Sequence, residues 1–243
     1  MTSSERRAQR RCSHILSPPS ARFACFAKDG GWSESYKMFP NPSVKFQELL
    51  LNFSQTQEMD ERHKIEETLW TDYGAEYAVF VLDMSGFSLL TRKHGIVHYL
   101  SMVQRMQLTT EPIVKSYGGI MIKYEADNCF AVFPEPLSAV NAAIAMQHAF
   151  AAANLLTSDD LDIHISCGID YGKILLIGHE DCFGEPVNRA SKIGEDLAAA
   201  GEILITKEAM EMIPNELGIN YREMSVSISG TVTPAYSIEY RKE

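Results

Sequence analysis

Two aspartates stand at positions where a chain can hold a divalent cation. Asp83 directly follows the apolar run 77–82 (YAVFVL) and precedes a turn with glycine at the start of a predicted helix. A carboxylate at the carboxyl end of a buried strand can ligate a cation, while the first amides of the helix, those of Gly86 and Phe87, receive phosphate oxygens. An aspartate before a helix is also a common N-cap, so this segment alone leaves both interpretations open.

The second aspartate lies in the segment 122–133 (IKYEADNCFAVF), which places Lys123, Glu125 and Asp127 on alternate residues before an almost entirely apolar run. A solvent-facing strand edge or turn accounts for this segment taken by itself. If the segment is a hairpin beside the strand 77–82, however, Asp127 and Asp83 share one end of a sheet. They then repel each other unless a cation lies between them. Two aspartates on neighbouring strand ends are the arrangement used in two-metal phosphoryl or nucleotidyl transfer.

The elements around these residues alternate between strand and helix patterns, which predicts an α+β sandwich with a mixed sheet covered by helices in the order βαββαβ. The segments 161–169 and 173–177 are expected to form a strand pair about Tyr171 and Gly172. Pro112 predicts a kink or a break in the long helix 86–117. The remaining expected elements are strands 77–82, 120–123, 129–133, 202–206 and 225–240, and helices 136–156, 186–200 and 207–213.

The first part of the chain differs in character. Residues 1–28 hold six Lys or Arg and one Glu, a composition shared by organelle transit peptides and by disordered, solvated tails. We expect residues 1–44 to be a basic, disordered extension and linker. Residues 45–74 have apolar side chains spaced by three and four, which predicts one long or two short amphipathic helices. Such a segment can pack on its own domain, residues 75–243, or pair with a second copy.

Composition excludes several classes of protein. The 243 residues are 45% hydrophobic and 22% charged, which is typical of soluble globular proteins. No run approaches the about 18 apolar residues of a membrane span, so we expect no transmembrane segment. The net charge of −10 argues against nucleic acid as a partner. Five scattered cysteines without CxxC spacing favour a reducing compartment, and we expect the cytoplasm, with an organelle as the alternative that the basic start admits.

Four motifs together resemble a known family. In order and spacing, the segments FVLDMSGFSLLT, IKYEADNCFAVF, CGIDYGKILLIG and FGEPVNRASKIGE are similar to the catalytic domain of class III nucleotidyl cyclases, the adenylate and guanylate cyclase family. The resemblance covers residues 77–240, about two thirds of the chain. It implies a ferredoxin-like βαββαβ sandwich and cyclisation of a nucleoside triphosphate.

The resemblance also implies roles for individual residues. Asp83 and Asp127 match the aspartates that hold two Mg²⁺ or Mn²⁺ ions in the family. Lys123 matches the lysine that reads adenine, and Asp181 matches the aspartate that completes this reading, which favours ATP. Asn188 matches the asparagine that orients the ribose.

Lys192 stands where the family has its transition-state residue. It follows Asn188 by four residues, so on a helix both side chains project from one face. The family implies a homodimer as well, in which each site takes its metals from one chain and its base-reading and transition-state residues from the other.

The sequence also departs from the family. Lys192 stands where the family usually has an arginine, so the planar bidentate contact to phosphate is lost. Arg189 is nearby but is expected to point elsewhere on the helix. Residues 227–232 (SISGTV) offer no match to the triphosphate-binding lysine, and Ala126 replaces a common glycine before the second aspartate. We therefore expect a low or regulated rate of cyclic AMP synthesis.

Two alternatives stay open. A catalytically silent cyclase-like module could bind a nucleotide or a partner and report through the helical segment 45–70. An active enzyme could instead use GTP or a pyrimidine triphosphate. The sequence does not identify an upstream regulator.

Overall fold

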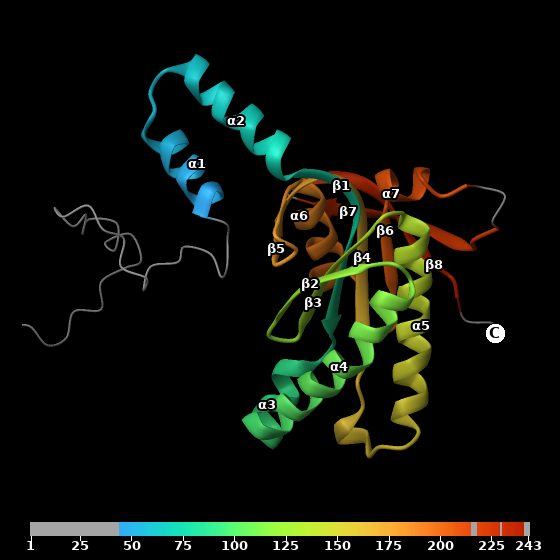
Figure 1. Ribbon diagram of the computed structural model, residues 1–243. Coiled ribbons are helices and arrows are strands. Elements are labelled where there is room, and N and C mark those ends of the chain that lie inside the picture. Colours follow the sequence, from blue (N-terminus) through green and yellow to red (C-terminus); the bar gives the residue numbers. More distant parts are fainter. Residues whose placement is uncertain (1–43, 215–217, 229, 241–243) are drawn as a thin grey trace, which may run out of the picture. The chain divides into compact units, whose positions relative to one another are not determined.

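A computed structural model describes residues 44–214, 218–228 and 230–240, without the side chains of residues 87–89, 228 and 231 (Figure 1). The expected disordered extension therefore lies outside the described residues, except that Val44 is already the first residue of a helix. Within the described ranges, no helix has the length and apolar character needed to cross a bilayer.

The described strands form one eight-stranded mixed sheet with the order β2-β3-β1-β4-β6-β8-β7, and β5 pairs with β4. The first four strands on this path, with the helices between them, give the expected βαββαβ arrangement. The strands are β1 (Gly74–Met84), β2 (Ile120–Glu125), β3 (Asn128–Phe133), β4 (Ile165–Ile177), β5 (Asp181–Phe183), β6 (Ile203–Thr206), β7 (Tyr221–Ile228) and β8 (Thr231–Ile238).

Helices cover both faces of this sheet. The long helices α4 and α5 run side by side along one face (Figure 1), and α6 packs on β1 and β4. The helices are α1 (Val44–Gln55), α2 (Met59–Tyr73), α3 (Phe87–His94), α4 (Ile96–Ser116), α5 (Pro136–Asn154), α6 (Glu185–Ser191) and α7 (Lys207–Glu211), with a 3-10 turn η2 (Asp159–Leu161) and a π-helical turn η3 (Lys192–Leu197).

Strand β1 is buried on both faces because its side chains alternate between two hydrophobic cores. Phe80 and Leu82 belong to the large core under α4 and α5, whereas Val79 and Val81 belong to a smaller core with Ala190 of α6. Successive side chains of a strand point to opposite faces. Asp83 is therefore on the same face of the sheet as Val79 and Val81, which is the face covered by α6.

The predicted strand pair at 161–177 is wrong. Residues 165–177 form the single strand β4, which pairs with β1 from Gly74 opposite Leu175 to Met84 opposite Ile165. Tyr171 and Gly172 suggested a turn, but the unbroken eleven-residue ladder with β1 stabilises an extended backbone through this position. Long-range strand pairing thus outweighs the local turn propensity.

The expected break in helix 86–117 exists, but it lies at Gly95 and not at Pro112. Gly95 has φ +88° and separates α3 from α4, and Pro112 lies inside α4. A positive φ is accessible to glycine at little cost. The predicted helix 186–200 is not α-helical throughout. Helix α6 ends at Ser191, and the next turn is π-helical.

The amphipathic segment 45–74 is two helices, and they pack on the sheet domain of the same chain. Phe46 of α1 and Leu69 of α2 are buried with Ile177 at the end of β4. Phe46 also stacks on Phe183 of β5, with ring centroids 6.3 Å apart. Helix α2 runs through Tyr73 directly into β1, further than the predicted end before residue 72.

Candidate active site

The two aspartates singled out in the sequence lie at the same end of the sheet. Strands β1 and β3 pair with Asp83 opposite Asn128, so the turn of the β2–β3 hairpin stands beside the carboxyl end of β1. The amide of Met84 donates to the carbonyl oxygen of Asp127 across 3.3 Å. Ala126, which precedes Asp127, adopts φ +54°, a region that glycine occupies more readily. The hairpin therefore makes this turn although the glycine common at this position is absent.

The environment of Asp83 disfavours its charged form. Burial, together with the neighbouring carboxylates of Asp127, Glu195 and Asp196, raises the pKa of Asp83 to about 6. Burial also raises the pKa of Asp127. Because these acids repel one another and are partly shielded from water, a divalent cation between them would lower the free energy of the ionised site.

Sequence reasoning missed the contribution of Glu195 and Asp196. Both lie in η3, whose backbone packs closely on β4. The contact between Gly168 and Gly194 is so close that a Cβ atom added to Gly168 would lie only 2.6 Å from the amide nitrogen of Gly194. Only glycine permits such an approach. The adjacent acids in KIGED were a visible signal, but their closeness to Asp83 depends on this tertiary contact.

Lys123 and Asp181 are brought together on the same chain. The ammonium of Lys123 lies 3.2 Å from Asp181 Oδ1 and 3.2 Å from Glu125 Oε2. It also lies 5.1 Å from the ring centroid of Phe130. Burial lowers the pKa of Lys123, but the hydrogen bonds to Asp181 and Glu125 outweigh it, so the pKa is raised. Lys123 is therefore a cation held in place on the sheet surface.

Asp181 is the more deeply placed member of this pair. Its side chain is 5% exposed, and its carboxylate Oδ1 accepts a hydrogen bond of 2.9 Å from the amide of Cys182. The short strand β5, which sequence analysis did not predict, pairs with the end of β4 and fixes this position. A donor and an acceptor thus stand side by side, which suits recognition of a planar heterocycle with the complementary pattern.

Asn188 and Lys192 occupy consecutive helical turns. Asn188 is exposed in α6, and Lys192 begins η3, where it forms an ion pair with Asp196. The expectation that both side chains share one face assumed an unbroken α-helix, and the change of winding begins at Lys192 itself. The ammonium of Lys192 is thus tied to an acid that also acts on Asp83.

Arg189 has a structural partner. Its guanidinium bonds to Asp170 of β4, whose side chain is fully buried and also accepts from the hydroxyl of Thr206. This agrees with the expectation that Arg189 points away from the position of Lys192. The pair anchors α6 on the sheet and so helps to place Asn188.

The start of α3 completes the surroundings of Asp83. Gly86 caps the helix with φ +77°, and Phe87 is its first residue. The side chain of Phe87 lies outside the described residues. The site therefore presents carboxylates and, beside them, the first turn of a helix that follows the strand bearing Asp83.

The comparison of sequences gives one curated relative. A putative adenylate cyclase 3 of Rhizobium meliloti (strain 1021) is 32% identical over 145 residues, which are 59% of this chain and 24% of the relative. The aligned part thus spans about a quarter of the length of that protein. No protein-family model matches the sequence.

Solved structures with a similar fold include several nucleotidyl cyclases. The adenylyl cyclase CyaB from P. aeruginosa superposes with a TM-score of 0.61 at 22% identity, covering 70% of this chain and 96% of the other. The guanylate cyclase domain of RhGC from Catenaria anguillulae, in complex with GTP, gives 0.58 at 20% identity over 69% and 97%. The catalytic core of a rhodopsin-guanylyl cyclase with converted specificity, in complex with ATPαS, gives 0.59 at 22% over 70% and 99%.

The sheet, the helices and the alignment thus agree with the motifs: the chain contains a domain with the fold of the class III adenylate and guanylate cyclase catalytic domains, and it resembles that family in sequence.

Proposed function

We propose that residues 75–243 form the catalytic domain of an adenylate cyclase, which converts ATP to 3',5'-cyclic AMP and pyrophosphate in intracellular signalling in the cytoplasm. The observation that carries the proposal is the presence of two separate polar groups on one chain. Asp83 and Asp127 form the first, and Lys123 with Asp181 forms the second.

The first group suits a pair of Mg²⁺ or Mn²⁺ ions. Carboxylate oxygens are the ligands that these hard cations prefer, and the pKa of Asp83 is raised by burial and by three neighbouring acids, whose repulsion a cation would offset. The bound ions would lower the pKa of the ribose 3'-hydroxyl and neutralise the triphosphate. Asp83 and Asp127 hold the ions, and the amides of Gly86 and Phe87 bind phosphate oxygens at the start of α3.

The second group favours adenine. Lys123 donates to N1 of the ring, and Asp181 accepts from the exocyclic amine. Guanine presents the opposite pattern on these edges, so Lys123 and Asp181 would lose their hydrogen bonds to the base at a cost of roughly 1 to 3 kcal/mol each. Because Lys123 and Asp181 are already neighbours at 3.2 Å, little ordering is needed when the base binds.

We infer a homodimer with two shared sites. The charged groups that shift the pKa of Lys123 are Asp181 and Glu125, whereas those that shift Asp83 are Asp127, Glu195 and Asp196. The two sets have no member in common, although Glu125 of the first set also contributes to the raised pKa of Glu195 in the second, which is due mainly to burial. One chain then offers its metal-binding acids to one site and its base-reading pair to the other, across a two-fold axis.

The remaining roles fall to helix α6 and the turn after it. Asn188 orients the ribose, so that the 3'-oxygen attacks the α-phosphate in line with the departing pyrophosphate. Lys192 stabilises the charge that develops on the phosphate. Its ion pair with Asp196 and its lack of a planar fork both reduce this effect, which supports a slow enzyme.

The direct test incubates the purified chain with Mn²⁺ and either ATP or GTP and measures the cyclic products. Cyclic AMP from wild type and none from Asp83→Asn is the expected result. Saturable nucleotide binding without any cyclic product would favour the silent module, and preferential turnover of GTP would overturn the roles given to Lys123 and Asp181.

A further inference from the structure

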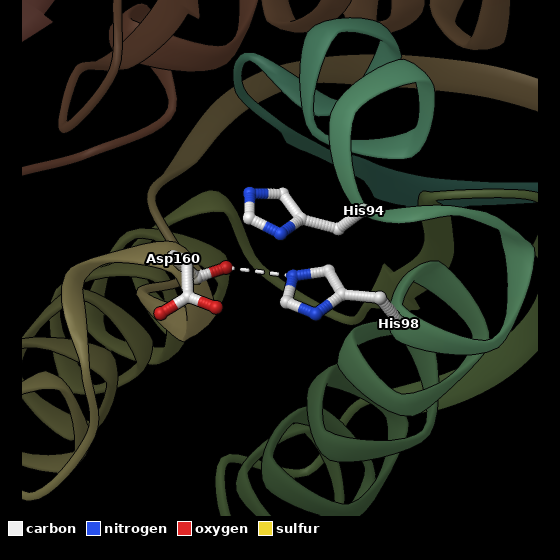
Figure 2. Close-up of side chains that lie close together, drawn as sticks. All are labelled: His94, His98 and Asp160. Carbon is white, nitrogen blue, oxygen red and sulfur yellow. Dashed lines mark hydrogen bonds between the residues drawn. The ribbon is translucent and has the colours of Figure 1, made fainter.

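A second group of potential metal ligands lies away from the acids of the candidate active site. His94 ends α3, His98 lies in the first turn of α4, and Asp160 comes from η2 (Figure 2). One ring nitrogen of each histidine and one carboxylate oxygen of Asp160 all lie within 4.8 Å of one another. We propose that these three side chains form a binding site for a divalent transition-metal ion such as Zn²⁺.

An unsatisfied nitrogen points to a missing ligand. The Nε2 atom of His94 is buried and has no hydrogen-bond partner among the described residues, which exclude the side chains of residues 87–89. A buried polar atom without a partner costs free energy, and most such atoms in folded proteins are paired. A metal ion bound to the imidazole of His94 would give this ring a partner.

The second histidine is held by a hydrogen bond to the segment that bears Asp160 (Figure 2). His98 Nε2 lies 2.7 Å from the carbonyl oxygen of Asp160, and since a carbonyl only accepts, this ring nitrogen is the donor. Metal-binding histidines commonly carry such a hydrogen bond from their other ring nitrogen. Arg105, two turns further along α4, donates to the carbonyl oxygen of Leu161 at 2.7 Å. Helix α4 therefore holds the segment that bears Asp160 at two points.

The two histidine rings are stacked beside Asp160. Figure 2 shows the two imidazole rings one above the other beside Asp160, with centroids 4.7 Å apart and planes 25° apart. Three side chains from three different elements thus meet at one place.

Zinc binding requires the side chains to move. Ligand atoms of a tetrahedral zinc ion with bonds near 2.0–2.1 Å are about 3.3 Å apart, so the three side chains must close in by rotation about their own bonds. The ring of His98 must also turn, because its Nε2 donates to the carbonyl oxygen of Asp160. The group borders an open hollow of about 630 Å³, which leaves room for water as a fourth ligand. The lining residues are Leu90, Lys93, His94, Ser158, Asp159 and Asp160. Lys93 is the one cation in that lining, and Asp159 lies there to offset it.

The donor set separates this site from the one formed by Asp83 and Asp127. Two imidazoles and a carboxylate suit Zn²⁺ and its neighbours, whereas Mg²⁺ prefers oxygen ligands alone. An ion here would join the corner between α3 and α4 to the segment before β4, more than sixty residues later in the chain. It should therefore stabilise the fold and resist displacement by millimolar Mg²⁺.

The test counts tightly bound Zn²⁺ on the chelator-treated full chain, by competition with a zinc indicator in excess Mg²⁺. Residues 1–43 also contain Cys12, His14 and Cys25, so the comparison is made between variants. The double substitution of His94 and His98 by Ala should lose one equivalent relative to wild type, whereas His63→Ala, on an exposed histidine of α2, should lose none. Zn²⁺ should raise Tm of the wild type and of His63→Ala but not of the double variant.

A milder pair of variants keeps both histidines and guards against misfolding. Asp160→Asn should weaken zinc binding roughly tenfold or more, while Asp60→Asn, on an exposed residue of α2, should bind as wild type does. Unchanged zinc stoichiometry and affinity in the double histidine variant would overturn the proposal. So would loss of the same equivalent in Asp83→Asn, because the ion would then belong to the other site.

Discussion

The substitution Asp83→Asn should stabilise the metal-free protein while it removes cyclase activity. Burial and three neighbouring acids raise the pKa of Asp83 from 3.8 to about 6, so the ionised carboxylate destabilises the folded state. At about 1.4 kcal/mol per unit, the shift corresponds to about 3 kcal/mol. The group is only half buried, and solvent screening reduces this to about 1 kcal/mol. For a chain of this size, Tm should rise by about 2–4 °C.

The size of this effect depends on pH. A carboxyl with a raised pKa in the folded state binds more protons when folded, so the cost develops as pH rises from 3.8 to about 6 and is complete above it. Thermal unfolding with EDTA should therefore show a larger gain for Asp83→Asn at pH 8 than at pH 5. Glu66→Gln, on the exposed face of α2, serves as the control. Mn²⁺ should raise Tm of the wild type and leave that of Asp83→Asn unchanged.

A lower Tm for Asp83→Asn in EDTA at pH 8 would contradict this reasoning, since it would show that the carboxylate contributes favourable contacts. An equal response of both proteins to Mn²⁺ would remove Asp83 from the metal site.

Three further predictions concern the base-reading pair, the buried ion pair and the phosphate-binding position. Lys123→Met should lower the preference for ATP over GTP roughly tenfold, as measured by kcat/KM for both substrates; an unchanged ratio would mean that Lys123 does not read the base. Arg189→Met leaves Asp170 buried without its cation and should cost about 3 kcal/mol of unfolding free energy in urea, with partial rescue by a second change, Asp170→Asn. Lys192→Arg restores the planar fork and should raise kcat roughly tenfold, and a fall in kcat would argue against a phosphate contact.

The features predicted best from the sequence are those fixed by the local residue pattern and by the usual connectivity of neighbouring strands. The β2–β3 hairpin lies beside β1, as the expected connectivity required, and this places Asp127 near Asp83. The continuous apolar run 77–82 marked β1 as buried, and the structure shows that it contributes to two cores.

The errors came from interactions between distant segments. Tyr171 and Gly172 form part of one strand because β1 provides eleven paired positions, and no local signal records that length. The effect of Glu195 on Asp83 depends on the contact of Gly168 with Gly194, which lie on different elements. Spacing within one segment cannot reveal such a contact.

The central claim is that two copies of this chain share each catalytic site, and mixing two inactive variants tests it most directly. Asp83→Asn lacks a metal ligand, and Asn188→Ala lacks the ribose contact, so each should make little cyclic AMP alone. When the two are unfolded and refolded together, half of the dimers should be mixed and should contain one intact site, which restores about a quarter of wild-type activity per chain. Failure of the mixture to exceed the two separate variants, beside an active wild type, would contradict the shared site.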